Sequence, residues 1–236
     1  MAVKRSSDAA EDEKPSKQTK LEFGRKTSSK IPTTSSKAEN AKRNNGSNAS
    51  GSSKKTSTFE APPRAKNGFE LSEISGDIFD APDGTVIIHA CNCVGSWSAG
   101  IAAAFKTRYP SAFKTYEKHC KESTPVDLVQ TALLIPPQDG SPKHYVGCLF
   151  TSKIYGRRKD SPKQIIEATA PAMKDLIDQM NEAGEDIKQI RICQINSGLF
   201  NVPWERSRAV LESIEVEDSQ NTKIPKEIIV YSLPEK

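Results

Sequence analysis

Apolar residues are concentrated after residue 67, where short runs typical of strands alternate with longer stretches at helical spacing. Continuous or alternating apolar runs predict strands at residues 69–74, 85–90, 128–135, 144–150, 189–195 and 227–233. Helical spacing and helix start signals predict helices at residues 99–109, 111–120, 161–183 and 203–214. Because strands and helices alternate, we expect one three-layer α/β/α domain with a central, mixed but mostly parallel sheet.

The longest predicted helix has a clear start, a buried face and an end. Ser161 and Pro162 are typical of an N-cap and a first helical turn. Residues at helical spacing define the face: Ile165, Ile166, Thr169, Met173, Leu176, Ile177 and Met180. Pro171 predicts a kink inside this helix, and Gly184 predicts its end.

Residues 1–66 differ from the rest of the chain in composition and charge. They hold 15 Lys+Arg against 7 Asp+Glu and few large apolar residues, whereas residues 67–236 hold 19 Lys+Arg against 23 Asp+Glu. The sequence therefore predicts a disordered basic tail at 1–66 and a folded domain at 67–236. Such a tail suits weak, salt-sensitive contact with nucleic acid. Its one apolar island, Leu21-Glu22-Phe23, is either a short docking motif or, as we favour, a chance hydrophobe.

Several protein classes are disfavoured. No apolar run approaches the roughly 18 residues of a membrane span, and the first residues, MAVKRSSDAAEDEK, lack the apolar core of a secretory signal. Five cysteines, an odd number, predict free thiols in a reducing compartment, hence a cytoplasmic or nuclear protein. Cys91 and Cys93 lack zinc-knuckle spacing, so we expect no structural metal and no cofactor. Nothing in the sequence demands more than a monomer.

Candidate chemistry gathers after three predicted strands. Residues 76–78, 92–100 and 196–198 are loops rich in Gly, Asn or Ser, and two of them lead into helices. In an open α/β sheet, ligands bind beyond the carboxyl ends of the strands, where loop N–H groups can hold phosphate. No standard nucleotide motif accounts for these loops. The alternative is that their glycines only form tight turns.

Few side chains suit acid–base work. His89 stands near the end of its predicted strand, on the ligand edge, and could activate water or protonate a leaving oxygen. The alternative is a buried imidazole that is hydrogen-bonded to a neighbour. Cys91 and Cys93 have no nearby Arg to activate a thiolate, so we interpret them as small core or loop thiols. Asp80 precedes Pro82 by two positions, and we interpret it as a turn residue.

Four segments, in order, resemble the macrodomain fold. They are GDIFDAP, HACNCVGSWSAGIAAAFKTRYP, CLFTS and QINSGLFNVPWE, and they look most like the ADP-ribose 1″-phosphate phosphatase branch of that family. The resemblance extends over about residues 68–233. It implies that Asp77 accepts a hydrogen bond from adenine and that Asn92 bonds the distal ribose. It also implies that backbone N–H groups of Cys91–Cys93 and Ser98–Ala102 wrap that ribose and its phosphate, while Ile195–Asn201 cradle the diphosphate.

The resemblance thus defines an expected site. The expected catalytic residues are His89 and Asn92. The expected substrate-binding residues are Gly76, Asp77, Ile78, Cys91, Asn92, Cys93, Ser98, Ala99, Gly100, Ile101, Ala102, Ala103, Ile195, Asn196, Ser197, Gly198, Leu199, Phe200 and Asn201. Ser98 and Ala99 depart from the family, which often has glycine there, so a loop that needs positive φ would be disturbed.

Three functions are compatible with this resemblance. The first is a phosphatase acting on ADP-ribose 1″-phosphate, a by-product of tRNA splicing. The second removes ADP-ribose from acidic protein side chains. Lys106 matches a lysine nucleophile of the terminal ADP-ribose protein glycohydrolases, but Phe200 stands where that chemistry wants an acid. The third is a non-catalytic ADP-ribose reader recruited by the basic tail. Of the aromatic residues near the site, Phe200 could stack on a sugar or base, whereas packing is favoured for Trp204 and equally open for Phe200.

Overall fold

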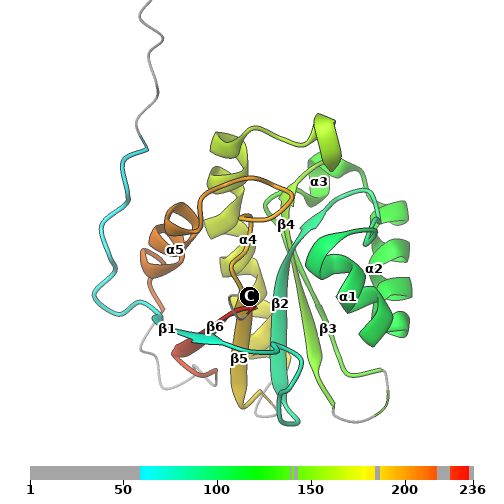
Figure 1. Ribbon diagram of the computed structural model, residues 1–236, viewed down its shortest axis with the longest axis horizontal. Coiled ribbons are helices and arrows are strands. Elements are labelled where there is room, and N and C mark those ends of the chain that lie inside the picture. Colours follow the sequence, from blue (N-terminus) through cyan, green and yellow to red (C-terminus); the bar gives the residue numbers. More distant parts are fainter. Residues whose placement is uncertain (1–58, 139, 141–142, 184–186, 217–223, 234–236) are drawn as a thin grey trace, which may run out of the picture. The chain divides into compact units, whose positions relative to one another are not determined.

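The computed structural model describes residues 59–138, 140, 143–183, 187–216 and 224–233 (Figure 1). The predicted features at residues 1–58, among them Leu21-Glu22-Phe23, and the predicted helix end at Gly184 lie outside these ranges. Within them, no helix combines the length and the hydropathy that crossing a membrane requires.

The described residues form one six-stranded sheet in the order β1-β6-β5-β2-β4-β3. All neighbouring strands pair in parallel except β3, which is antiparallel to β4. This confirms the predicted mixed, mostly parallel sheet. The strands are β1 (Glu70–Ser75), β2 (Thr85–Asn92), β3 (Ala132–Ile135), β4 (Tyr145–Ser152), β5 (Gln189–Cys193) and β6 (Glu227–Ser232).

Helices cover both faces of this sheet. On β2, Val86 and Ile88 pack into a core with α4 and α5, whereas Ile87 packs into a second core with α1 and α2 (Figure 1). This alternation along a strand buried on both faces gives the predicted three layers. The helices are α1 (Gly100–Arg108), α2 (Pro110–Glu122), α3 (Pro125–Leu128), the 3₁₀ turn η1 (Gly156–Arg158), α4 (Pro162–Ala183) and α5 (Trp204–Glu212). The whole predicted apolar face of α4 is buried, and Pro171 lies inside this helix.

Some elements begin or end at other residues than predicted. Leu128, where a strand was predicted to begin, instead ends the helix α3, because Thr124 caps this turn and Pro125 occupies its first position. Gln130 then adopts a left-handed φ of 76°, and the strand begins only at Ala132. Pro110 does not merely stop α1 but opens α2 at once.

A close approach of α4 to the sheet depends on Gly147. A Cβ atom at this position of β4 would lie 2.9 Å from Cγ1 of Ile88 and 3.0 Å from Cδ2 of Leu176. Both distances are shorter than normal packing allows, so the absence of a side chain lets the longest helix sit directly on β2 and β4.

The outer edge of β3 is bonded by side chains of α4. The N–H of Ala132 donates to Oδ2 of Asp175 at 2.6 Å, and the N–H of Leu134 donates to Oε1 of Gln179 at 2.8 Å. Nε2 of Gln179 also donates to the carbonyl of Ala132 at 3.0 Å. Backbone groups that an edge strand normally offers to solvent are thus satisfied within the domain.

The described chain contacts the domain earlier than the predicted boundary at residue 66. Phe59 packs against the cluster of Phe200 and Val210, and the guanidinium of Arg206 lies 5.1 Å from the centre of its ring. The N–H of Ala65 donates to the carbonyl of Glu212 at 3.0 Å. Residues 59–66 therefore contain contacts with α5, at Phe59 and Ala65, although their polar composition predicted a disordered tail.

We expect a chain that begins at Phe59 to unfold at a higher denaturant concentration than one that begins at Asn67. The shorter chain loses the packing of Phe59 and the backbone bond of Ala65, which together contribute about 1–3 kcal/mol. Urea unfolding of the two chains, with the full chain as reference, measures this. Equal midpoints of the two shorter chains would show that residues 59–66 do not stabilise the domain. A lower midpoint for the chain that begins at Phe59 than for the full chain would show that residues 1–58 contribute to stability.

Candidate functional site

Four loops leave the sheet at one edge. The strands β1, β2, β4 and β5 run in one direction, so their carboxyl ends lie at the same edge of the sheet. Their last residues are Ser75, Asn92, Ser152 and Cys193. This confirms the predicted grouping of the three polar loops, here named the first loop (76–80), the second loop (92–100) and the third loop (194–201). The segment after β4 is a fourth loop at this edge, and the sequence did not suggest it as part of the site.

The first loop holds Asp77 at the surface. Its Oδ1 accepts the N–H of Phe79 at 2.9 Å, and its carbonyl accepts the N–H of Asp80 at 3.2 Å. Ile78 and Phe79 are buried, while the N–H of Gly76 donates to Ser232. The turn therefore anchors an exposed carboxylate that still has a second oxygen to offer.

A buried cation, Arg191, supports the first loop from beneath. Its Nε donates to Oε1 of Gln189 at 2.6 Å, and its Nη1 donates to the carbonyl of Asp80. The guanidinium also lies 4.8 Å from the ring centre of Tyr231. Among the described residues no carboxylate forms an ion pair with it. Sequence reasoning missed this residue, although a charge inside the apolar strand QIRIC was a usable signal.

The side chain of Asn92 organises the second loop. Its Oδ1 accepts the N–H groups of Val94 at 3.1 Å and Ser96 at 3.2 Å, and the hydroxyl of Tyr116 donates to the backbone carbonyl of Asn92 at 2.7 Å. Its Nδ2 donates to the carbonyl of Ser96 at 2.6 Å. An amide oxygen has two lone pairs, and the two N–H donors occupy both, so this geometry favours a positioning role over the expected catalytic one. A ribose contact could come only from the remaining Nδ2 hydrogen.

Ser98 and Ala99 fit their backbone without strain. In the second loop, positive φ occurs at Gly95 (72°) and Gly100 (58°), whereas Ala99 is extended at −153°. The departure from glycine therefore does not disturb the loop. Ala99 forms no side-chain cap, so the first N–H groups of α1 have no such partner. Residues 98–101 are exposed, and together with the helix dipole they form a surface suited to an anion.

Asn196 anchors the third loop from inside. It is 4% exposed and adopts a left-handed φ of 63°. Its Oδ1 accepts the hydroxyl of Thr151 at 2.8 Å, and its Nδ2 donates to Thr169 and Ser207, each at 3.1 Å. Its carbonyl accepts the N–H of Val202 at 3.0 Å. The side chain of Asn196 is thus used within the protein and is not left for a ligand.

The tip of the third loop reaches the second loop. Gly198 is open on its side-chain face, and Leu199 is 65% exposed. A Cβ on Gly100 would lie 3.6 Å from Cδ1 of Leu199, so the two loops meet at the start of α1. Asn201, also left-handed with φ 58°, closes the tip by donating its N–H to Gly198 at 2.9 Å.

The aromatic side chains near these loops are used for packing. Phe200 is buried against Val202 and Val210, which favours packing over stacking on a ligand. Trp97 stacks on Tyr116 with ring centres 4.8 Å apart. Trp204 is buried and donates its Nε1 hydrogen to Glu73 at 3.2 Å.

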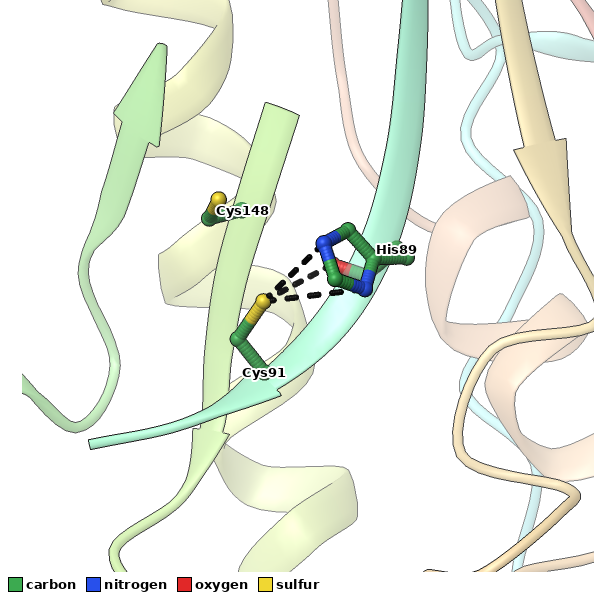
Figure 2. A group of neighbouring side chains, drawn as sticks. All are labelled: His89, Cys91 and Cys148. Atoms are coloured by element: carbon green, nitrogen blue, oxygen red, sulfur yellow. Dashed lines mark hydrogen bonds between the residues drawn. The ribbon is translucent and has the colours of Figure 1, made fainter. Parts of the chain in front are cut away.

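His89 is the expected catalytic residue that the structure places least favourably. It is 0% exposed, and its ring stacks on Phe105 at 3.9 Å between centres and meets Trp97 edge-on at 4.8 Å. Figure 2 shows the ring facing the sulfur of Cys91, with Cys148 on neighbouring β4. Because no part of the side chain reaches the surface, this placement favours the alternative, a buried imidazole, and the catalytic role of His89 stays a prediction.

The same three side chains are the one group of metal-type donors among the described residues. Their ligand atoms lie within 4.8 Å of one another, and thiol and imidazole groups suit zinc or copper. However, Sγ of Cys91 lies 3.3 Å from Nε2 and 3.8 Å from Nδ1 of His89, near both nitrogens instead of in line with one. Three buried donors also fall short of the four that close a structural zinc site. The absence of a structural metal stays a prediction.

The cysteines are placed as unreactive thiols. All five are free, and four are buried. Burial raises the pKa of Cys91 and Cys93 well above the ordinary value, that of Cys120 to about 11 and that of Cys193 to about 12. Because the thiolate is the nucleophile, these shifts oppose a cysteine mechanism.

Lys106 is engaged by an aromatic ring. Its Nζ lies 4.0 Å from the ring centre of Phe113, between α1 and α2. A cation held over an aromatic face is not presented as a nucleophile.

We expect the folded protein to react slowly with a disulfide reagent such as DTNB at pH 8. A thiol with a raised pKa is neutral there, so reactivity should rise only as the pH approaches 11. Five thiols should titrate at once after unfolding in urea. Rapid labelling of Cys91 or Cys93 in the folded protein, located by peptide mass spectrometry, would restore them as candidate nucleophiles.

Comparison with known proteins agrees with this architecture. The family model described as Macro domain matches residues 88–211. The ADP-ribose 1″-phosphate phosphatase of Chaetomium globosum is 47% identical over 160 residues, covering 64% of this chain and 86% of that protein. The protein of the same name from Neosartorya fischeri is 42% identical over 183 residues, covering 63% of this chain and 92% of that protein. The macrodomain of Mycobacterium tuberculosis DarG is similar in fold, with a TM-score of 0.52, 23% identity and coverage of 71% and 100%. The chain therefore belongs to the Macro domain family.

Proposed function

We propose that this protein is a phosphatase that hydrolyses ADP-ribose 1″-phosphate to ADP-ribose and phosphate. The observation that carries the proposal is the exposed, uncapped start of α1, an anion-binding surface in a chain whose curated relatives have that name at 47% and 42% identity. The proposal includes the clearance of a tRNA-splicing by-product, which the resemblance implies.

The ligand would lie along the four-loop edge. Adenine would meet the exposed carboxylate of Asp77, and the diphosphate would lie along the backbone of residues 195–201. The distal ribose and its phosphate would face residues 98–103 at the start of α1. This order follows the strand order, in which β1 is separated from β2 by β6 and β5.

The reaction needs water to attack phosphorus while the bond to the sugar oxygen breaks and that oxygen takes a proton. Backbone N–H groups of residues 98–102 can stabilise the charge that grows on the phosphate oxygens. Ser96 donates its hydroxyl to Ser98 at 3.1 Å, which leaves the hydroxyl hydrogen of Ser98 free to donate to phosphate. Catalysis would then rest on fixed donors and a positioned water, with Asn92 holding the loop.

The two alternatives have weaker support. Removal of ADP-ribose from protein carboxylates would need an available Lys106 and an acid at Phe200, but the first lies over Phe113 and the second is packed. A non-catalytic reader would use the same loops and differ only in having no turnover. Its recruitment would depend on the basic residues 1–66, which we propose as a weak nucleic-acid contact.

Phosphate release tests the proposal directly. The purified protein is offered ADP-ribose 1″-phosphate and, in parallel, a mono-ADP-ribosylated protein. We expect inorganic phosphate from the first and no ADP-ribose from the second. Binding of ADP-ribose without any phosphate release would support the reader, and release of ADP-ribose from the modified protein would support the glycohydrolase.

We expect Asp77→Ala to weaken ADP-ribose binding by about ten- to a hundredfold. The loss of a hydrogen bond to a charged group costs roughly 1.5–3 kcal/mol. Asp80→Ala is the matched control, because it removes the same charge from the same turn while keeping the carbonyl that accepts from Arg191. Calorimetric titration should find the control within about twofold of wild type. An unchanged affinity of a folded Asp77→Ala variant, or equal losses in both variants, would refute the adenine contact.

We expect His89→Ala to lower the free energy of unfolding by about 2–4 kcal/mol, because it empties a buried site stacked on Phe105. His89→Phe should restore much of that stability, since it keeps a flat ring of similar size without nitrogen. Turnover of the folded His89→Phe variant should stay within a few-fold of wild type. A fall in turnover of roughly 10²–10⁴-fold at unchanged ADP-ribose affinity would instead identify His89 as a general acid or base.

A further inference from the structure

A basic segment at residues 153–159, KIYGRRK, follows β4 and lies outside the loops that would contact ADP-ribose. It contains four of the cations of a domain that is otherwise acidic, since residues 67–236 hold 19 Lys+Arg against 23 Asp+Glu. Arg157 and Arg158 are exposed on η1. In the part of the chain that the structure describes, neither has a carboxylate within ion-pair distance. Two uncompensated guanidinium groups therefore stand side by side in the sequence on a short turn.

The base of this segment is fixed. The hydroxyl of Ser152 donates to the carbonyl of Ile154 at 2.8 Å and accepts the N–H of Asp160 at 3.1 Å. Asp160 accepts the N–H of Lys153 at 2.8 Å and lies 3.6 Å from its ammonium. The one carboxylate at the base is thus already paired with Lys153, which leaves the charge of the two arginines unopposed.

The segment leaves the sheet between the second and third loops. The N–H of Cys93 lies 3.2 Å from the carbonyl of Ser152 and 3.3 Å from that of Lys153. On the other side, Thr151 bonds the side chain of Asn196 at 2.8 Å. Figure 1 shows the yellow-green turn after β4 at the same edge of the sheet as the orange loop that precedes α5. The arginines are therefore carried by the loop next to the two that would hold the distal ribose and the diphosphate.

We propose that Arg157 and Arg158 form a specificity subsite for the terminal phosphate, so that the protein prefers the phosphorylated ligand to its own product. This inference rests on the proposed function and deepens it. The substrate differs from ADP-ribose only by a dianionic phosphate at the distal end. A guanidinium group can bind two oxygens of one phosphate through two parallel N–H donors. A neighbouring cation pair raises affinity for the dianion and leaves the product, which lacks that group, unaffected. Because affinity rises for the substrate alone, ADP-ribose competes less well for the site, and product inhibition is weaker.

The test is the double variant R157Q/R158Q in the full chain. We expect the KM for ADP-ribose 1″-phosphate to rise about tenfold and the Kd of ADP-ribose to stay within about twofold. We also expect the wild-type KM to rise more steeply than that of the variant when salt is raised from about 50 mM to about 300 mM, because exposed charges are screened.

The matched control is R108Q/K188Q, which removes the same charge at the opposite edge of the sheet. Arg108 precedes Tyr109, whose hydroxyl lies 2.7 Å from Nδ1 of His144 just before β4, and the N–H of Lys188 donates to Gly84 just before β2. The control should match wild type in both constants.

Three results would overturn the subsite: an unchanged KM in R157Q/R158Q, an equal loss of ADP-ribose affinity, or an equal effect in the control. Wild-type turnover in the same assay decides the proposed function separately. If the wild type releases no phosphate, the uncleaved ADP-ribose 1″-phosphate is titrated directly, and equal affinity in wild type and R157Q/R158Q overturns the subsite.

Discussion

The buried amide of Asn196 is the interaction on which the ligand edge depends. A single side chain bonds Thr151 at the end of β4, Thr169 within α4 and Ser207 within α5. Such a group is costly to bury unless its partners are all present, so these elements must meet in one arrangement. The left-handed backbone of the same residue then turns the third loop out over the sheet. Core and site are therefore specified together.

Several polar side chains at this edge face inward, which leaves backbone groups for the proposed ligand. Asn92 and Asn196 are used to hold their loops, and Arg191 holds the first loop from below. Besides the exposed carboxylate of Asp77, a row of N–H groups remains at the start of α1, bordered by Leu199 and Ile101. Recognition by backbone depends on loop shape more than on side-chain identity, which explains why Ser98 and Ala99 are compatible with the site.

The sequence predicted those parts of the fold that local pattern determines. β2 was recognisable because a strand buried on both faces must be continuously apolar, and α4 because its buried face repeats at helical spacing. Gathering of the loops at one edge followed from the parallel pairing. The roles of individual side chains did not follow, because they depend on partners far away in the sequence. The sequence around His89 is the same whether its ring meets solvent or Phe105. The sequence around Asn92 is likewise the same whether its side chain bonds a ribose or the N–H groups of its own loop.

The bonds from Asp175 and Gln179 to β3 also govern how copies of the protein can meet. A strand from another molecule could extend the sheet at β3 only after Asp175 and Gln179 had released Ala132 and Leu134. At the opposite side, β1 carries the exposed carboxylate of Glu70, which repels a like strand, whereas the carboxylate of Glu73 is paired with Arg208. Two copies that meet at high concentration would therefore contact each other through loops and helices, and the sheet would not extend from one molecule to the next.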